Sequence, residues 1–216
     1  MKNRGLMSGD TKKESNYVFE DGKFIGNFDQ MYANLDDPWM QTEEIFASEK
    51  AVCLNLIGKF RRRKVVEFGS GLGYFTKQLA QVAENVIGVE ISPTAIDRAR
   101  ALHPQLDFRC APFPDLEFLR NFKPDCIVMA EITWYVLDEL DHFINFLKTE
   151  MPHVLLIHLL TTYEKGEQKY GAEKFTNLEE ILNYFDINVV EYGEVYRPCV
   201  GGGRTFFAGA YTRFNL

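Results

Sequence analysis

The feature that most constrains the fold is a glycine-rich turn that directly follows an apolar segment. Residues 65–74 read Val-Val-Glu-Phe-Gly-Ser-Gly-Leu-Gly-Tyr, with Gly69, Gly71 and Gly73 at alternate positions and Ser70 between the first two. Glycines let a ligand approach the backbone, and the first turn of a helix presents unpaired N–H groups. The segment therefore predicts a strand, a turn and a helix start that together bind a nucleotide-like ligand.

The spacing of the glycines separates two classes of ligand. A dinucleotide fold requires G-x-G-x-x-G, and its last position would fall on Tyr74 here. Glu67, two residues before the first glycine, would repel a pyrophosphate but suits the ammonium group of an amino-acid cofactor. We therefore expect the ligand to be cationic at this end.

A second acid belongs to the same predicted site. Residues 86–90 form another apolar segment that ends at Glu90, 23 residues after Glu67. A carboxylate at the end of the second strand can accept hydrogen bonds from both ribose hydroxyls, and Ile91 would lie beside it. The two acids and the three glycines are thus expected to form one cofactor site.

Short apolar runs alternate with helical patterns after residue 63, which predicts a parallel sheet covered on both faces. The expected strands are residues 64–68, 85–90, 107–110, 125–130 and 153–159. The expected helices are residues 75–83, 93–102, 116–121, 137–148 and 178–185. Two final apolar runs, residues 187–196 and 205–211, predict an antiparallel pair. The fold class is therefore α/β, a single doubly wound, seven-stranded, mostly parallel sheet with a terminal antiparallel hairpin.

The N-terminal part has a different pattern. Residues 1–20 are polar and show no period, so we expect a disordered tail before a domain that covers residues 21–216. Within a helical cover of about residues 21–60, Asp37 is expected to cap a helix that begins at Pro38.

Composition narrows the classes of partner. The net charge is −7 and the basic residues are dispersed, apart from a run at residues 61–64 that we interpret as a solvated turn, so we expect no nucleic-acid partner. No apolar run approaches the roughly 20 residues of a membrane span, and the N-terminus has no secretory pattern, which favours the cytoplasm. The four cysteines lack metal-ligand spacing, so we expect no metal site and reduced thiols.

With both motifs in place, the sequence resembles the class I S-adenosylmethionine-dependent methyltransferases, whose Rossmann-like fold begins with acid-x-Gly-x-Gly-x-Gly. It is more narrowly similar to the nodulation protein S type, which methylates an amino-sugar nitrogen. The closer match rests on residues 37–39 with Glu49 and Lys50, and on residues 130–137, 171–175 and 211–214. The resemblance implies S-adenosylmethionine as cofactor, and similar sequences occur among enzymes that decorate bacterial surface glycans.

One stretch departs from that family. Many members have an acid after the third strand that binds the adenine amino group, whereas residues 109–114 here read Arg-Cys-Ala-Pro-Phe-Pro. We expect the backbone at Ala111 to replace that contact, with Phe113 or Phe68 as an apolar wall.

The acceptor side should lie where the fourth and fifth strands end, because open α/β sheets bind ligands there. Thr133, after the fourth strand, and Thr161, after the fifth, are among the candidates. Glu131 is expected to orient an amine or act as base, or alternatively to cap the next helix. His158 is a second candidate base, or alternatively a core residue. Trp134 and Tyr135 are expected either in the pocket wall or in the core.

Two aromatic residues of the N-terminal segment complete the predicted site. Tyr32 and Trp39 could cover the sulfonium, because aromatic faces attract cations. The alternative is that they form a hydrophobic staple that holds the first helix.

Three functions remain open from the sequence. The leading one is transfer of a methyl group to oxygen or nitrogen of a small-molecule or glycan acceptor, in modification of a surface polysaccharide or capsule. The others are an NAD-dependent oxidoreductase and a non-catalytic nucleotide-binding module. The sequence does not fix the acceptor or the oligomeric state.

Overall fold

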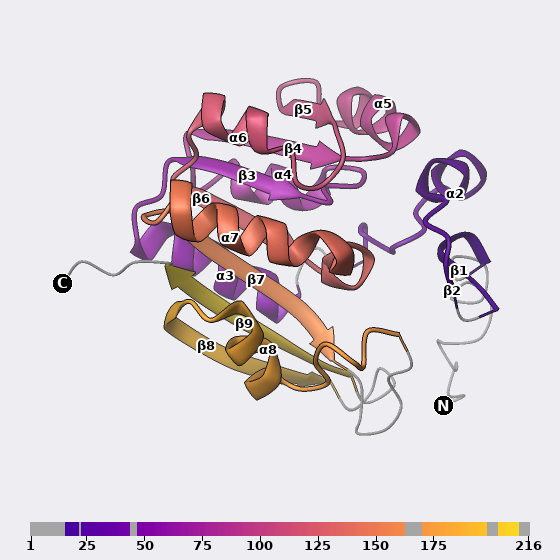
Figure 1. Ribbon diagram of the computed structural model, residues 1–216. Helices are drawn as coiled ribbons and strands as arrows, with labels where there is room; N and C mark the ends of the chain where they lie inside the picture. The colour runs from indigo at the N-terminus through magenta and orange to yellow at the C-terminus, as the bar shows by residue number, and fades with distance from the viewer. Residues whose placement is uncertain (1–15, 22, 44–46, 163–169, 198–202, 212–216) are drawn as a thin grey trace, which may run out of the picture.

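The computed structural model describes residues 16–21, 23–43, 47–162, 170–197 and 203–211. Its centre is a seven-stranded sheet in the order β5-β4-β3-β6-β7-β9-β8 (Figure 1). The strands are β3 (Lys64–Phe68), β4 (Asn85–Glu90), β5 (Asp107–Cys110), β6 (Cys126–Ala130), β7 (Leu155–Thr162), β8 (Asn188–Arg197) and β9 (Gly203–Tyr211). The predicted fold class is therefore confirmed. Most of the expected tail, residues 1–15, lies outside the described residues.

The register of the sheet fixes where a ligand can bind. β3 pairs in parallel with β4 on one side and with β6 on the other, so the chain reverses its direction of travel across the sheet at β3. In open α/β sheets the crevice for ligands lies at the carboxyl ends of the strands at this switch point. The glycine turn after β3 therefore lies where such a crevice is expected.

β7 is longer than the sequence indicated. The expected strand ended at residue 159, whereas β7 continues to Thr162. Its extension is paired with β9 in antiparallel register, with Thr161 opposite Thr205. The antiparallel partner is distant in sequence, and it brings these two threonines to the pocket edge of the sheet.

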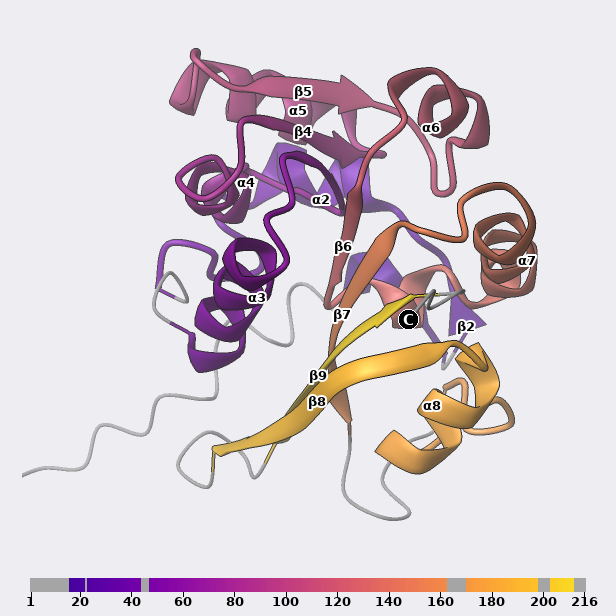
Figure 2. The ribbon, with the colours of Figure 1, turned by 90° about the vertical axis from the view of Figure 1, so that its left-hand side faces the viewer.

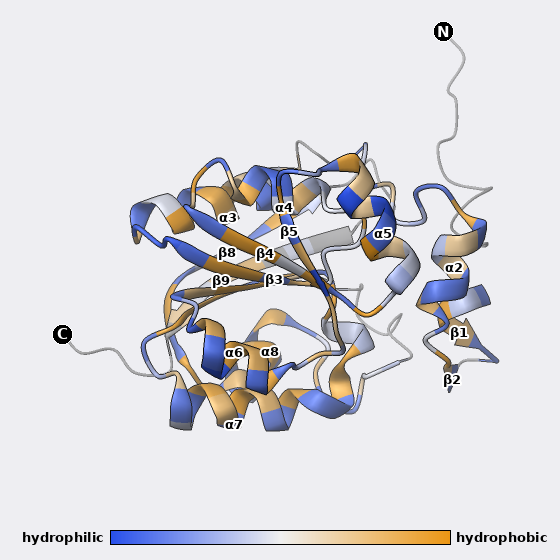
Figure 3. Cartoon of the chain, turned by 90° about the horizontal axis from the view of Figure 1, so that it is seen from above, coloured by the Kyte–Doolittle hydropathy of each residue, from blue (hydrophilic) through white to orange (hydrophobic). Residues whose placement is uncertain are grey.

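Helices cover both faces of the sheet (Figures 2 and 3). One face carries α3 (Ser48–Lys59), α4 (Tyr74–Leu79) and α5 (Pro93–Leu102), and the other carries α6 (Leu116–Phe122), α7 (Leu140–Glu150) and α8 (Leu178–Phe185). Ser92 caps α5 as predicted, since its hydroxyl accepts the Ala95 N–H at 3.0 Å. The layers bury two apolar clusters, one on each face of the sheet.

The prediction of a helix that begins at Pro38 is wrong. Residues 36–43 form turns, and α3 begins only at Ser48. The Asp37 carboxylate does accept backbone N–H groups, from Gln41 at 2.8 Å and Thr42 at 2.9 Å, but Met40 has a φ of 48° and reverses the chain. Asp37 therefore stabilises a loop and not a helix. This loop runs toward the glycine-rich segment after β3.

The N-terminal cover comprises β1 (Phe19–Glu20), β2 (Lys23–Phe24), α2 (Phe28–Asn34) and the turns that follow. It lies beside the carboxyl edge of the sheet (Figure 1). The Asp29 carboxylate accepts the Ser92 hydroxyl at 2.7 Å and the Thr94 N–H at 2.9 Å. Arg98 of α5 donates to the carbonyls of Tyr32 and Leu35, both at 2.9 Å. Helix α5 thus holds the cover over the site.

We predict that Gly73→Ala destabilises the protein by about 1–3 kcal/mol, because a side chain would be strained there and would overpack the core. Gly73 has a φ of 80°, and an added Cβ would lie 2.5 Å from the Phe108 ring. Urea unfolding measures the change. In the matched control, Gly58→Ala in α3, the added Cβ meets nothing within 4 Å, and stability should stay equal or rise by up to about 1 kcal/mol. Equal effects at the two positions would contradict the account.

Candidate functional site

A pocket of about 650 Å³ lies between the carboxyl edge of the sheet and the N-terminal cover. This volume is in the range of about 300–1,000 Å³ that small-molecule sites occupy. The pocket is lined by the ends of β3, β4, β6 and β7 and by aromatic residues of the cover. Of the predicted site residues it brings together Tyr32, Trp39, Glu67, Gly69, Glu90, Ile91, Ala111, Glu131, Trp134 and Tyr135.

The three glycines have different structural tasks. All have positive φ, at 76° for Gly69, 53° for Gly71 and 80° for Gly73. Gly69 lines the pocket, and an added Cβ would lie 2.1 Å from the Ile132 side chain. Ser70, Gly71 and Gly73 were predicted to contact the cofactor but do not line the pocket. They shape the turn beneath it.

Gln41 was missed by the sequence analysis. Its side-chain oxygen accepts the Leu72 N–H at 2.8 Å, and its amide nitrogen lies 3.4 Å from the Ser70 carbonyl. A Cβ on Gly71 would approach both this amide and the Tyr32 hydroxyl to within 3 Å. The cover therefore packs directly on the glycine turn, a long-range contact that has no local sequence signal.

Glu67 is buried at the end of β3, with 2% of its surface exposed. Burial raises its pKa to about 7, opposed by the Thr76 hydroxyl, which donates to Oε2 at 2.5 Å, and by the positive charge of Lys50. A carboxylate with so little water around it is stabilised by a cation. The position therefore fits an ammonium group.

Glu90 ends β4 as predicted and lies beside Glu67 in the pocket wall. Its carboxylate accepts three backbone N–H groups, from Ile91 at 2.9 Å, Ser92 at 3.0 Å and Gly71 at 3.2 Å. Burial raises the pKa of Glu90, and these hydrogen bonds oppose the rise. The carboxylate is thereby fixed in orientation and can accept hydroxyl groups of a ligand.

A backbone hydrogen bond limits how Ala111 could contact an adenine. Ala111 lines the pocket, but its N–H donates to the Glu90 carbonyl at 3.0 Å in continuation of the pairing between β4 and β5. Only its carbonyl remains on the backbone for an adenine. The predicted apolar wall is present, because Phe68 and Phe113 both line the pocket with ring centroids 5.0 Å apart.

The far half of the pocket contains Glu131 and an aromatic wall. Thr161 donates to the Glu131 carboxylate through its N–H at 2.8 Å and through its hydroxyl at 3.0 Å. Trp39 and Tyr135 meet with centroids 5.6 Å apart, and Trp134 donates its indole N–H to the Thr161 carbonyl at 2.9 Å. Of the predicted acceptor-side residues, Glu131, Trp134, Tyr135 and Thr161 therefore line the pocket, whereas Thr133 does not.

His158 does not reach the pocket, and its prediction as a base is corrected. It lies on the opposite face of the sheet, 3% exposed, where its Nε2 is 2.5 Å from the Thr133 hydroxyl and its ring packs 4.8 Å from that of Phe185. Burial lowers its pKa to about 3, so the ring is neutral at physiological pH. The alternative reading, a core histidine, agrees with this position.

Lys50 is one of the residues on which the family resemblance rests, and no local pattern in the sequence indicates its role. It lies in the first turns of α3, lines the pocket and is the one basic side chain among the described residues that do so. Its Nζ is 5.6 Å from the centroid of Phe75, and its charge lowers the pKa of Glu67. The end of the pocket near Glu67 therefore presents one cation beside an anion, which fits a zwitterion.

In the part of the chain that the structure describes, no helix is both long enough and apolar enough to cross a membrane. No group of three or more His, Cys, Asp or Glu side chains is arranged to hold a metal ion there. Cys53, Cys110 and Cys126 are free thiols, and Cys199 lies outside the described residues.

Comparison with known proteins agrees with the site. Residues 65–149, from β3 to the end of α7, match the model of a protein family described as "Methyltransferase domain". A 74-residue segment is 38% identical to the biotin biosynthesis bifunctional protein BioHC from Cellvibrio japonicus (strain Ueda107). This match covers 34% of the chain and 15% of that much longer relative.

The fold is shared with solved structures. The N-methyltransferase NodS from Bradyrhizobium japonicum WM9, in complex with S-adenosyl-L-homocysteine, has a TM-score of 0.63 at 17% identity, over 87% of this chain and all of that chain. The PH0226 protein from Pyrococcus horikoshii OT3 has a TM-score of 0.61 at 13% identity, over 84% and 98% of the two chains.

Residues 65–149 thus match a methyltransferase-domain family, and the order of strands and the acidic glycine turn agree with that match. Among solved structures, the fold of the chain resembles that of NodS.

The raised pKa of Glu67 predicts a pH-dependent stability for the ligand-free protein. Because the folded pKa is about 7 and the ordinary value is 4.5, its contribution is fully present below pH 4.5 and lost as the pH rises through 7. Between pH 5.5 and 8 the loss is about 2 kcal/mol by linkage. Urea unfolding measures the free energy of unfolding of Glu67→Gln and of the unchanged protein at both pH values. The difference between the two proteins should shift by about 2 kcal/mol in favour of the variant from pH 5.5 to pH 8. A difference independent of pH would contradict the account.

Proposed function

We propose that the protein transfers the methyl group of S-adenosylmethionine to an oxygen or nitrogen atom of a small-molecule or carbohydrate acceptor, in the cytoplasm, during modification of a surface polysaccharide or capsule. One observation supports this most directly. The acidic cofactor end, with Glu67 and Glu90, and the aromatic acceptor end, with Glu131, belong to one continuous pocket. Transfer in a single displacement requires the two reactants in one such space.

The residues at the cofactor end fit the groups of S-adenosylmethionine. Glu67 would receive the ammonium group and Lys50 the carboxylate of its methionine part, while Glu90 would accept the ribose hydroxyls. Phe113 and Phe68 would contact the adenine from the apolar side. Bound S-adenosylmethionine supplies an electrophilic methyl group on a sulfonium, and all remaining tasks fall to the chain's own residues.

The first of those tasks is alignment. Trp39, Tyr135 and Tyr32 line the pocket, and their faces would favour a cation and exclude water. The aromatic residues would hold the acceptor atom in line with the methyl group of the donor. Holding both partners in line accounts for much of the rate of such a reaction.

The second task is the acceptor's proton. Glu131 is the acid at the acceptor end, and we propose that it orients the acceptor or takes the proton that its O–H or N–H loses. Other charges in the pocket also restrict the acceptor. Asp138 and Glu139 also line the pocket, and their charges would disfavour acceptors with a carboxylate or phosphate close to the reacting atom.

The oxidoreductase alternative is disfavoured by the buried acid before the glycine turn. A nicotinamide dinucleotide has a pyrophosphate, which Glu67 would repel. A non-catalytic binding module would bind S-adenosylhomocysteine but transfer no methyl group. Transfer of a labelled methyl group to an acceptor distinguishes the enzyme from such a module.

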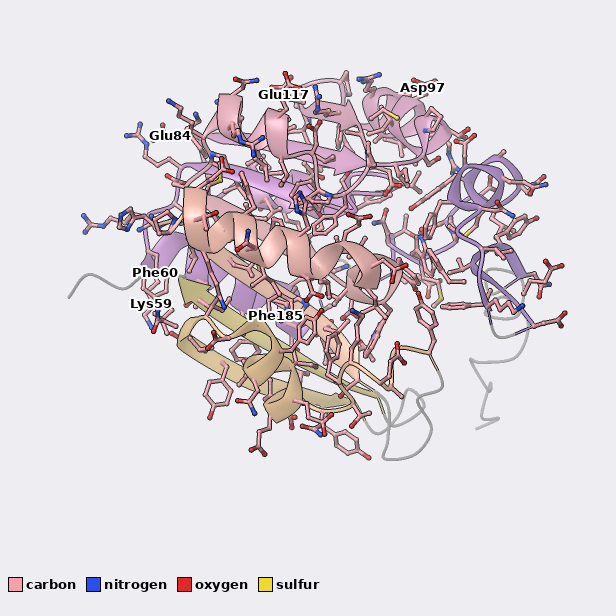
Figure 4. The ribbon with its side chains drawn as sticks, viewed as in Figure 1. Lys59, Phe60, Glu84, Asp97, Glu117 and Phe185 are labelled. Atoms are coloured by element: carbon pink, nitrogen blue, oxygen red, sulfur yellow. The ribbon has the colours of Figure 1, made fainter. Side chains whose placement is uncertain are left out.

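We predict that Glu90→Gln weakens binding of S-adenosylhomocysteine by about 10- to 100-fold, the usual value of hydrogen bonds to a charged group. Isothermal titration calorimetry measures it. Asp97→Ala is the control, because Asp97 is exposed on α5 and points away from the domain (Figure 4). If the Glu90 and Asp97 variants bind equally well, the ribose assignment is wrong.

Lys50→Met has a more selective expected effect. It should weaken S-adenosylhomocysteine about tenfold or more, yet leave methylthioadenosine unchanged, because the latter lacks the amino-acid part. Lys59→Met, near the opposite end of α3 and paired with Glu191, is the control. If Lys50→Met loses the same affinity for both ligands, Lys50 does not bind the carboxylate of the amino-acid part.

The acceptor is tested by transfer of a labelled methyl group to a panel of sugars, amino sugars and their phosphorylated forms. We predict transfer to an uncharged or amine-bearing acceptor, and a loss of about 100-fold or more in kcat/KM for Glu131→Gln. Glu117→Gln, exposed on α6, should be fully active (Figure 4). Full activity of Glu131→Gln would exclude Glu131 as a base and would mean that alignment of the two reactants is sufficient.

A further inference from the structure

Three side chains from three chain segments form a continuous hydrogen-bonded row in the acceptor half of the pocket. The Thr205 hydroxyl of β9 lies 2.9 Å from the Thr161 hydroxyl of β7, which lies 3.0 Å from Oε1 of Glu131, the residue after β6. All three line the pocket. Thr161 also donates its N–H to Oε2 at 2.8 Å, so both carboxylate oxygens are bound by the same residue.

The direction of the protons follows from chemistry. An ionised carboxylate can only accept hydrogen bonds, and a hydroxyl has a single proton to donate. The Thr161 proton is therefore committed to Glu131, and the bond between the two threonines must take its proton from Thr205. Each donor in such a row polarises the next, which strengthens the bond to the carboxylate.

The backbone around the row is fixed at several points. Glu131 has a φ of 61°, a left-handed conformation that is uncommon outside glycine, and its N–H donates to the Leu159 carbonyl at 2.9 Å. The Trp134 indole holds the carbonyl of Thr161. Strain of this kind persists only where surrounding contacts determine it, and it concentrates at functional sites.

We propose that Thr205 and Thr161 form a hydroxyl relay that keeps Glu131 ionised and aimed at the acceptor. The inference rests on the proposed function, because it concerns how Glu131 is prepared for the acceptor's O–H or N–H. Thr161 and Thr205 are positioning residues that act through Glu131. The relay donates hydrogen bonds without transferring a proton, so no bond is broken in it.

Other charges share the pocket and must be separated from the relay. The further titratable side chains that line it are Glu49 and Lys50 of α3, Glu67 and Glu90 of β3 and β4, Asp138 and Glu139 of the 3₁₀ turn Leu137–Glu139, and the tyrosines Tyr32, Tyr135 and Tyr170. None of these is changed by a threonine substitution. A shift caused by Thr205 therefore reports the relay itself.

Titration of the Glu131 side chain by carbon-13 NMR of the full chain, with ¹³C-labelled glutamate, tests the proposal without an acceptor. The Glu131→Gln spectrum assigns the signal. We expect Thr161→Val to raise the proton affinity of Glu131 about tenfold, and Thr205→Val about two- to threefold through the weakened Thr161 bond. Thr161→Ser and Thr205→Ser keep the hydroxyls and should restore the original titration.

Thr162→Val is the matched control, because Thr162 is the next residue of β7, its side chain points to the other face of the sheet, and it does not line the pocket. The control should leave the Glu131 titration unchanged. An unchanged titration in Thr205→Val, or the same shift in Thr162→Val, overturns the relay and leaves a structural threonine pair.

Failure of the proposed function has a different signature. In that case the unchanged protein either binds no S-adenosylhomocysteine in calorimetry or binds it and transfers no methyl group to any acceptor of the panel, whatever the Glu131 titration shows. Once an acceptor is known, we further expect Thr205→Val to lower kcat more than it raises KM. The loss of kcat should be greatest at low pH.

Discussion

The arrangement of the site depends on the Glu90 carboxylate, which joins the glycine turn to the start of α5. It accepts the Gly71 N–H from one segment and the Ile91 and Ser92 N–H groups from the other. Burial of a carboxylate without such donors would cost free energy of folding. The glycine turn and the start of α5 are therefore stabilised in the geometry that brings their N–H groups to the Glu90 carboxylate. The same fixed carboxylate is what a ribose would meet.

The N-terminal cover extends this geometry into a closed site. Asp29 and Arg98 bind it to α5, and Gln41 binds it to the glycine turn, so its aromatic residues are held over the strand ends. The cover supplies the apolar and aromatic surface, and the strand ends supply the charges. The methyl donor and the acceptor would therefore meet in a space whose two walls come from different parts of the chain.

The sequence predicted what depends on local chemistry. Alternating strands and helices, the capped start of α5, and the acids Glu67 and Glu90 all follow from short-range patterns, and the structure has them in the predicted places. It could not separate a catalytic from a core role for His158, because both need a histidine in an apolar strand. Gln41 and Thr205 were missed for another reason. Their contacts join segments that are distant in sequence, and no local pattern signals them.

The central claim, that the acidic glycine turn holds a cationic nucleoside cofactor, is tested most directly by thermal-shift titration with S-adenosylhomocysteine and NAD in parallel. Ligands that bind only the folded state raise its stability by an amount set by concentration and affinity, about 2.7 kcal/mol at 100 times the Kd. We expect a concentration-dependent rise in Tm with S-adenosylhomocysteine and none with NAD. A rise with NAD alone, or with neither ligand, would show that the glycine turn does not hold such a cofactor.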